Sequence, residues 1–399
     1  MKKTRILSLL LSLVLCLSCF SVMASAAETV TLNVYNWGQY IADGTDDSID
    51  VIAEFEAAYP HIKVNYMTFD SNESMYTKLK AGGSSFDIII PSDYMVEKLI
   101  AEDMLEELDF SNIPNFQYID ESFKNPNYDP ENRYSVPYTW GAVGVIYNTS
   151  YVREEDVGSW DLLWNEAYSG QILMFDNPRD AFAIAQLELG FSINSEDSLE
   201  LAVSAQLLQS QKPVVQAYVM DQVYDKMQRG EAWIAPYYAG DYLMMVEENP
   251  DLAFYYPEEG YNLFVDAICI PKGCEHKEEA ELFINFLTDP EIMGQNLEYL
   301  GYSAPSTAAK EYMDPEIASD PIAYPDAETL TRGQSFSSLS LEGTQEMNRL
   351  WLQVKTADTT TTVYIILTIT AATLVIFLWI FFKIRRRRKK ARRCQKWKT

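Results

Sequence analysis

The sequence predicts an α/β fold built as two lobes, placed between an N-terminal export signal and a C-terminal membrane anchor. Along most of the chain, segments in which apolar and polar residues alternate, as in strands, are followed by segments with the apolar spacing of helices. About 330 residues lie between the two terminal signals, which is too much chain for one small core. Aromatic and polar residues follow several of the predicted strands, where α/β sheets bind their ligands. The sequence therefore predicts a ligand site beyond the carboxyl ends of the strands.

The N-terminus carries an export signal. Three basic residues precede an apolar run over residues 6–23, and the small residues 24–26 form a cleavage pattern. Residues 1–27 are therefore predicted to be a signal peptide. A lipid on Cys19 is the alternative, but the residue three positions earlier is Cys16 rather than an aliphatic residue.

The first exported segment has the pattern of a β-α-β unit. Residues 30–34 alternate as a strand, residues 51–59 have helical spacing and stop at Pro60, and residues 62–66 alternate again. A second helix is predicted over residues 73–81. It leads into the apolar run 87–91, which is typical of a strand buried on both faces of a parallel sheet.

A second lobe is predicted to begin at the glycine-rich crossing 140–144. Ser159 is expected to cap a helix that contains Trp160 and Trp164. Four strands are predicted in this part of the chain, and polar or aromatic loops follow two of them, at residues 176–180 and 237–241. The strands are residues 143–147, 171–175, 230–235 and 263–268.

The C-terminus has the pattern of a membrane anchor. Residues 363–382 are uncharged, and a helix of that length crosses a hydrocarbon core of about 30 Å. Residues 383–399 contain eleven basic residues and no acid, so this tail is expected in the cytoplasm. Residues 357–362 are predicted to be a linker. The chain is thus expected to cross the cell membrane once, with its binding domain extracellular or periplasmic.

The exported part is strongly acidic. All 58 acidic residues but only 17 of the 31 basic ones lie in residues 28–358, which gives this part a formal net charge of −41. Such a surface repels phosphates and concentrates cations, so it excludes nucleic acid as a partner and favours small cationic solutes. Solubility or adaptation to salt is the simpler explanation of the charge taken alone.

The sequence gives little support to an enzyme, a metal site or a cofactor. The chain has two histidines, His61 at the start of a strand and His276 at a polar helix start, and both are expected at the surface. It has no glycine-rich phosphate loop with a lysine. Cys269 and Cys274 are the exported cysteines, and the sequence leaves open whether they form a disulfide or remain free thiols.

A series of short motifs occurs in order between Thr31 and Lys355. They are Tyr35-Asn36-Trp37 with Tyr40, the run 71–76 with 78–80, Phe86-Asp87 through Pro91-Ser92, Val136-Pro137-Tyr138 with Trp140-Gly141, Ser159-Trp160 with Asp161-Leu162, the run 284–287, Gly301-Tyr302 and the run 324–329. In these motifs the exported part resembles the extracytoplasmic spermidine/putrescine-binding proteins of bacterial polyamine ABC importers.

This resemblance implies a type II periplasmic-binding-protein clamp with two discontinuous lobes. One lobe would comprise residues 28–141 and 266–310, and the other residues 142–265 and 311–356. The ligand would be a polyamine, and the partners an ABC permease and its cytoplasmic ATPase. A sensor of polyamines or other cationic solutes that acts through a membrane partner is the alternative function.

The resemblance also implies the residues of the ligand site. Aromatic rings would pack along the methylenes of the polyamine, and carboxylates would hold its ammonium groups. Asp266 is the leading candidate, because an aspartate between apolar neighbours in a strand needs a compensating cation. The expected site residues are Trp37, Tyr40, Ser92, Tyr94, Asp180, Tyr238, Asp241, Phe264, Asp266 and Tyr302.

The sequence departs from the family pattern at several of these places. Gly38 and Gln39 stand where a hydroxyl and an acid are common, Asn177 replaces an acid, and Phe336 replaces a glutamine of some members. Asp93, Asp176 and Asp241 could restore the missing charge. Arg179 is expected to position its loop rather than face the ligand, because a free cation would repel a polyamine. The choice between putrescine and spermidine stays open.

Overall fold

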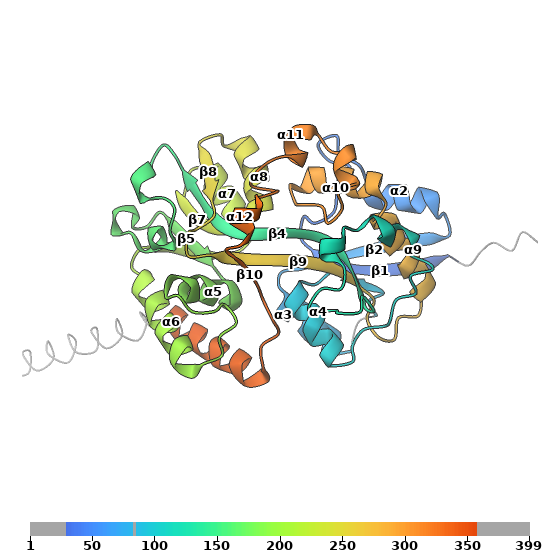
Figure 1. The fold of residues 1–399 in the computed structure, drawn as a ribbon, viewed down its shortest axis with the longest axis horizontal. Coiled ribbons are helices and arrows are strands. Elements are labelled where there is room, and N and C mark those ends of the chain that lie inside the picture. The colour runs from blue at the N-terminus through green and yellow to red at the C-terminus, as the bar shows by residue number, and fades with distance from the viewer. Residues whose placement is uncertain (1–28, 83–84, 357–399) are drawn as a thin grey trace, which may run out of the picture.

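The computed structural model describes residues 29–82 and 85–356 of the chain. The predicted signal peptide, linker, membrane helix and basic tail all lie outside these residues. Within the described ranges, no helix is long and apolar enough to cross a membrane. The strands join in one sheet path of order β2-β1-β3-β9-β4-β7-β5-β6, and β4 and β9 lie between the two halves of an elongated molecule (Figure 1).

The buried apolar residues form two main clusters, which define the two lobes. The cluster of the first lobe is drawn from residues 32–138 and 264–313. The cluster of the second lobe is drawn from residues 142–261 and 336–354. A smaller third cluster, from residues 35–105 with Ala267 and Cys269, also lies in the first lobe. The exact limits of the two lobes stay a prediction.

The first lobe begins with the expected β-α-β unit, because β1 pairs with β2 in parallel across α2. Asp50 caps α2 by accepting a hydrogen bond from the backbone N–H of Ala53, and Ser71 and Ser74 form a capping box at the start of α3. The elements are β1 (Val30–Trp37), α2 (Val51–Ala58), β2 (Ile62–Phe69), α3 (Asn72–Lys80), β3 (Ile88–Ile89), α4 (Asp93–Ala101), α9 (Lys277–Leu287) and α10 (Pro290–Leu300).

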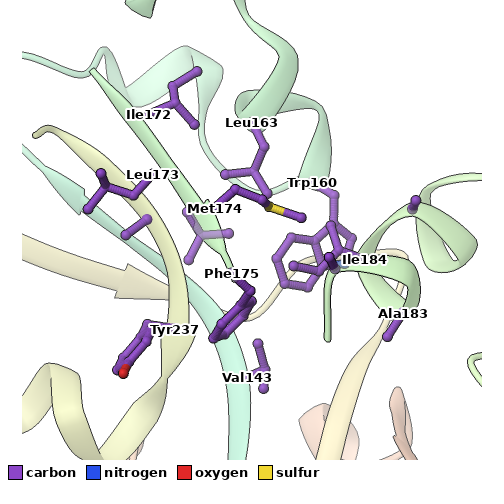
Figure 2. Packing of buried hydrophobic residues seen from close by; sticks show 14 of the residues in the cluster. Val143, Trp160, Leu163, Ile172, Leu173, Met174, Phe175, Ala183, Ile184 and Tyr237 are labelled. Carbon is purple, nitrogen blue, oxygen red and sulfur yellow. The ribbon is translucent and has the colours of Figure 1, made fainter. Parts of the chain in front are cut away.

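The second lobe packs its core around β5, where Phe175 and Trp160 are fully buried (Figure 2). The expected cap is present, since the side chain of Ser159 accepts a hydrogen bond from the N–H of Asp161, although the helix is a 3₁₀ turn. The elements are β5 (Ile172–Phe175), α5 (Pro178–Glu188), α6 (Ser198–Gln211), β6 (Val215–Val219), α7 (Gln222–Gln228), β7 (Ile234–Tyr238), α8 (Ala239–Glu248) and β8 (Leu252–Tyr255).

One strand prediction in this lobe was wrong in its position. The strand expected over residues 230–235 starts only at Ile234 and continues to Tyr238. Gly230 has a φ of 68° and belongs to the turn that ends α7, so the residues after it cannot yet pair with the sheet. The two tyrosines expected in the following loop therefore stand at the end of the strand.

Two long antiparallel strands connect the lobes. They are β4 (Ser135–Asn148) and β9 (Tyr261–Cys269), which pair from Ser135 to Ala142 with a register shift after Pro137. The glycine-rich crossing thus lies inside a strand. A Cβ at Gly141 would lie 2.7 Å from the Phe264 ring, so the missing side chain makes room for that ring on the neighbouring strand.

The remaining chain returns across both lobes. The short strand β10 (Gly333–Ser335) pairs with β9 in parallel, and residues 341–356 form a helix that packs on the second lobe. Trp351 of this helix lies edge to face against Tyr218 at 5.4 Å. The other short elements are η1 (Pro114–Tyr118), η2 (Glu121–Phe123), η3 (Glu154–Asp156), η4 (Trp160–Trp164), η5 (Glu166–Tyr168), η6 (Ala309–Tyr312), α11 (Pro315–Ala318) and α12 (Ala327–Leu330).

The two described cysteines are free thiols. Cys269 is buried at the end of β9, whereas Cys274 is partly buried and donates to Asp87 Oδ1 at 3.2 Å. Of the two possibilities that the sequence left open, the structure therefore has the thiols rather than a disulfide.

Candidate ligand-binding site

A pocket between the lobes is lined by all ten of the expected site residues. It lies where the strands end: Trp37 closes β1, Ser92 follows β3, and Tyr238 closes β7. Parallel strands bring their carboxyl ends to the same edge of a sheet, which explains why residues far apart in the sequence meet here. The lining residues that carry the argument below are the acids Asp70, Asp180, Asp221, Asp241 and Asp266.

Asp266 is the most buried of the acids that line the pocket. It lies on β9 and is 4% exposed, and Tyr40 donates its hydroxyl to Asp266 Oδ2 at 2.5 Å. The other carboxylate oxygen, Oδ1, is buried and has no hydrogen-bond partner in the described structure. Burial raises the pKa of Asp266 to about 6. Because Oδ1 has no partner, the Asp266 side chain can accept a hydrogen bond from a ligand.

Asp180 stands in the first turn of α5, after the end of β5. Its Oδ2 accepts hydrogen bonds from Asn177 Nδ2 at 2.7 Å and from the Tyr238 hydroxyl at 3.1 Å. Burial raises its pKa to about 7, and the hydrogen bond from Tyr238 opposes that shift. The residue that replaces a family acid, Asn177, thus orients the neighbouring acid.

Asp241 holds the corresponding place in the first turn of α8. It accepts hydrogen bonds from the hydroxyls of Tyr224 and Tyr302, the second at 3.0 Å. Tyr302 follows α10 in the first lobe, so this contact joins the lobes. Burial raises the pKa of Asp241 to about 7. The negative Asp221 nearby raises it further.

Aromatic rings surround these carboxylates. Tyr40 and Tyr302 meet edge to face with centroids 5.1 Å apart, and Tyr238 and Phe264 do so at 5.5 Å. Trp37 packs against Phe69 at 4.6 Å on the first lobe. Ring faces offer apolar contact to methylene groups and attract cations through their quadrupoles. The pocket thus combines apolar walls with negative charge.

Ser92 and Tyr94 are held by a small polar network. Asn72 donates to the hydroxyls of both residues at 3.1 Å, and Tyr94 donates its own hydroxyl to Glu73 Oε1 at 3.0 Å. Tyr94 also packs edge to face on Phe336 at 5.8 Å. The network fixes the side of the pocket formed by α3 and α4.

Arg179 is the one basic residue among the described residues that line the pocket. Its Nη2 donates to Asn194 Oδ1 at 2.7 Å and to the backbone oxygen of Ser337 at 3.0 Å. The guanidinium carbon lies 4.3 Å from the centroid of the Phe336 ring. These contacts hold the segment that follows β10, as a positioning role requires. Nε and Nη1 are buried without a hydrogen-bond partner in the described structure, so the positioning role stays a prediction.

Two of the acids that were expected to restore the missing charge do not line the pocket. Asp93 is buried, its Oδ1 accepts a hydrogen bond from the N–H of Tyr94 at 2.7 Å, and burial raises its pKa to about 8. Asp176 forms an ion pair with Lys355 Nζ at 2.6 Å on the outside of the second lobe. The prediction for Asp93 was wrong because this residue begins α4 and is buried there. The prediction for Asp176 was wrong because its partner, Lys355, is 179 residues away in the sequence.

The sequence analysis also missed several lining residues. Asp70 follows β2, so the rule that found the other loops applies to it. Asp221 follows β6, which the sequence analysis did not predict as a strand, so the rule could not find it. Tyr224 was missed because it lies inside α7 rather than in a loop after a strand, and its partner Asp241 is distant in the sequence. In the described part of the chain, no group of three or more potential ligands could hold a metal ion.

Comparison with known proteins gives the class of this chain. The model of the family "Bacterial extracellular solute-binding protein" matches residues 50–325. The spermidine/putrescine-binding periplasmic protein of Escherichia coli (strain K12) is 34% identical over 312 residues, which cover 78% of this chain and 88% of that protein. This chain therefore belongs to the bacterial extracellular solute-binding proteins.

Solved structures agree with this assignment. The spermidine/putrescine ABC transporter substrate-binding protein PotD of Streptococcus pneumoniae has a TM-score of 0.70 and 37% identity, covering 82% of this chain and 98% of that one. The TpPotD lipoprotein of Treponema pallidum has a TM-score of 0.72 and 28% identity, covering 81% and 99%. The expected type II periplasmic-binding-protein fold is confirmed, and the binding domain is extracellular or periplasmic.

The burial of Asp266 predicts how the stability of the ligand-free protein depends on pH. The pKa of this acid is about 6 in the folded protein against 3.8 for an ordinary aspartate, so the protonated form favours folding. That contribution is complete below pH 4 and is lost as the pH rises through 6. Between pH 5 and pH 8, Asp266→Asn should gain on the order of 1 kcal/mol of unfolding free energy relative to wild type.

The measurement is chemical denaturation of the two proteins at both pH values. Asp225→Asn is the matched control, since that residue is on the surface with its side chain 70% exposed and pairs with Arg229. A difference between wild type and Asp266→Asn that does not change with pH would contradict the assignment of a raised pKa.

Proposed function

We propose that this protein captures a polyamine outside the cell and delivers it to an ABC importer. The observation that carries the proposal is a pocket in which Asp180, Asp241 and Asp266 are all at least nine-tenths buried, while Arg179 is the one base that lines it among the described residues, and its Nη2 is bonded to Asn194 and Ser337. Buried carboxylates that are not compensated by a cation destabilise the fold. A polycation is the ligand that would compensate all of them.

The aromatic walls support the same ligand. A polyamine has cationic centres separated by apolar methylene chains, so it needs carboxylates at intervals and apolar contact between them. Trp37, Phe264 and Tyr302 line the same pocket as the acids. The relatives named for spermidine and putrescine add support to this assignment. Nothing in the described site favours catalysis, and the relatives are components of transporters.

We also propose that residues 363–382 anchor the chain in the membrane. The last described helix, residues 341–356, is fixed to the second lobe by Trp351 and by the ion pair of Lys355 with Asp176. The chain therefore leaves the domain from the second lobe, seven residues before the uncharged segment. An anchor would keep the binding protein close to its permease.

Binding should be saturable and should depend on Asp266. The full chain, purified in detergent, should bind one polyamine per protein in a calorimetric titration at about 0.5 M salt, where loose surface binding is screened. Asp266→Asn should weaken this binding about 30-fold to 1000-fold, because a charge-assisted hydrogen bond in a dry pocket is lost.

The exposed variant Asp225→Asn is the control and should bind like wild type. The proposal fails if no diamine or triamine shows a single saturable site at this salt concentration. Unchanged affinity in a folded Asp266→Asn protein would exclude that residue as an ammonium ligand.

The anchor makes a prediction about topology. Protease added to intact wall-stripped cells should release a fragment of about 330 residues, whereas a tag placed after Thr399 should stay protected. Removal of residues 362–399 should send a binding-competent domain into the medium. Digestion of the tag from outside, or a truncated protein that stays with the membrane, would contradict a C-terminal anchor and favour a lipid on Cys19.

A further inference from the structure

The segment that follows β10 passes between the two lobes on one side of the pocket. Residues 336–340, called the strap below, have no regular secondary structure and connect β10 to the last helix, residues 341–356. The strap runs between α5 of the second lobe and α3 and α4 of the first lobe (Figure 1). Its first residue, Phe336, is buried and lines the pocket. The position of the strap therefore affects the shape of the site.

The strap is fixed to the second lobe at two places. The backbone N–H of Ser337 donates to Asn194 Oδ1 at 2.8 Å, and Arg179 Nη2 donates to the backbone oxygen of Ser337 at 3.0 Å. The backbone N–H of Ser340 donates to Glu196 Oε1 at 2.9 Å. The strap therefore belongs to the second lobe and should move with it.

Two residues of α4 in the first lobe contact the other side of the strap. Glu97 Oε2 accepts a hydrogen bond from the backbone N–H of Ser338 at 2.6 Å, and the Tyr94 ring packs edge to face on the Phe336 ring at 5.8 Å. Tyr94 and Glu97 are three residues apart, so they lie on the same face of α4. Among the described residues, the bond to Glu97 is the one hydrogen bond between the strap and the first lobe.

Glu97 acts at a distance from the ligand. It is partly buried and does not line the pocket, so it is not a ligand contact. A carboxylate that accepts from a backbone N–H forms a charge-assisted hydrogen bond, which is stronger than a bond between neutral groups. Because this bond joins a first-lobe helix to a second-lobe segment, it stabilises only the arrangement in which the two lobes meet.

We propose that Glu97 is a positioning residue that latches the lobes around the ligand through the Ser338 N–H and so slows ligand release. This inference rests on the proposed function, because it takes a polyamine as the ligand. Separation of the lobes opens the pocket, and it also breaks the bond between Glu97 and the strap. The bond is absent while the lobes are apart, so it should change the rate of release rather than the rate of capture.

The test measures polyamine release from the full chain in detergent by stopped-flow mixing. Tryptophan fluorescence is the signal, because Trp37 lines the pocket. Glu97→Ala should release spermidine and putrescine about tenfold faster, by the same factor for both, and should keep an association rate within about twofold of wild type. Glu97→Gln keeps an oxygen that can accept the hydrogen bond, so its release should be at most about threefold faster.

Two substitutions of Ser338 provide the matched controls. Ser338→Ala keeps the backbone N–H and should behave like wild type. Ser338→Pro removes the N–H and should release the ligand as fast as Glu97→Ala does. Combining Ser338→Pro with Glu97→Ala should give no further acceleration, because both substitutions remove the same contact.

Three results would overturn the latch while the proposed function stands. They are equal effects of Glu97→Ala and Glu97→Gln, which would assign the effect to charge alone, unchanged release in a folded Glu97→Ala protein, and slower capture in place of faster release. If wild type binds neither amine, the proposed function itself fails, and the latch fails with it.

Discussion

Three buried carboxylates in a pocket that one base, Arg179, lines among the described residues are the constraint on which the rest of this structure depends. Burial raises the pKa of Asp180, Asp241 and Asp266 to between about 6 and 7, which means that each acid resists ionisation in the ligand-free protein. A globular protein gains nothing from this arrangement by itself. The arrangement becomes favourable when a cationic ligand supplies the missing charge. The buried acids therefore lower the stability of the ligand-free protein.

The architecture brings these acids together from separate lobes. Asp266 stands on β9, one of the two strands that pass between the lobes, and its neighbour Ala267 is hydrogen-bonded through its N–H to the backbone of Pro91. Asp180 and Asp241 stand instead in the first turns of second-lobe helices. The contact of Asp241 with Tyr302 joins the lobes directly. Charge compensation by a ligand therefore acts on parts of the chain that the two lobes contribute separately.

Much of this could be predicted from the sequence, because its signals are local. The alternation of residues 30–34 and 62–66, and the stop at Pro60, define a β-α-β unit without knowledge of the rest of the chain. The resemblance supplied ten residues that the fold brings to one pocket. What could not be predicted depends on distant partners. Asp176 pairs with Lys355, Asp93 is buried and does not line the pocket, and Asp221 reaches the pocket only when the second lobe is folded. Residues 230–233 were misread because apolar composition does not reveal a left-handed glycine at a helix end.

The most direct test of this account is the number of protons released when a polyamine binds. Calorimetry of the full chain with spermidine at pH 6.5, in two buffers of different ionisation enthalpy, measures that number. Because the acids are partly protonated in the empty pocket and ionised against ammonium groups in the complex, binding should release protons, and the affinity should rise with pH between 5.5 and 8. Binding without proton release, or with proton uptake, would contradict the claim that the ligand is held by buried carboxylates.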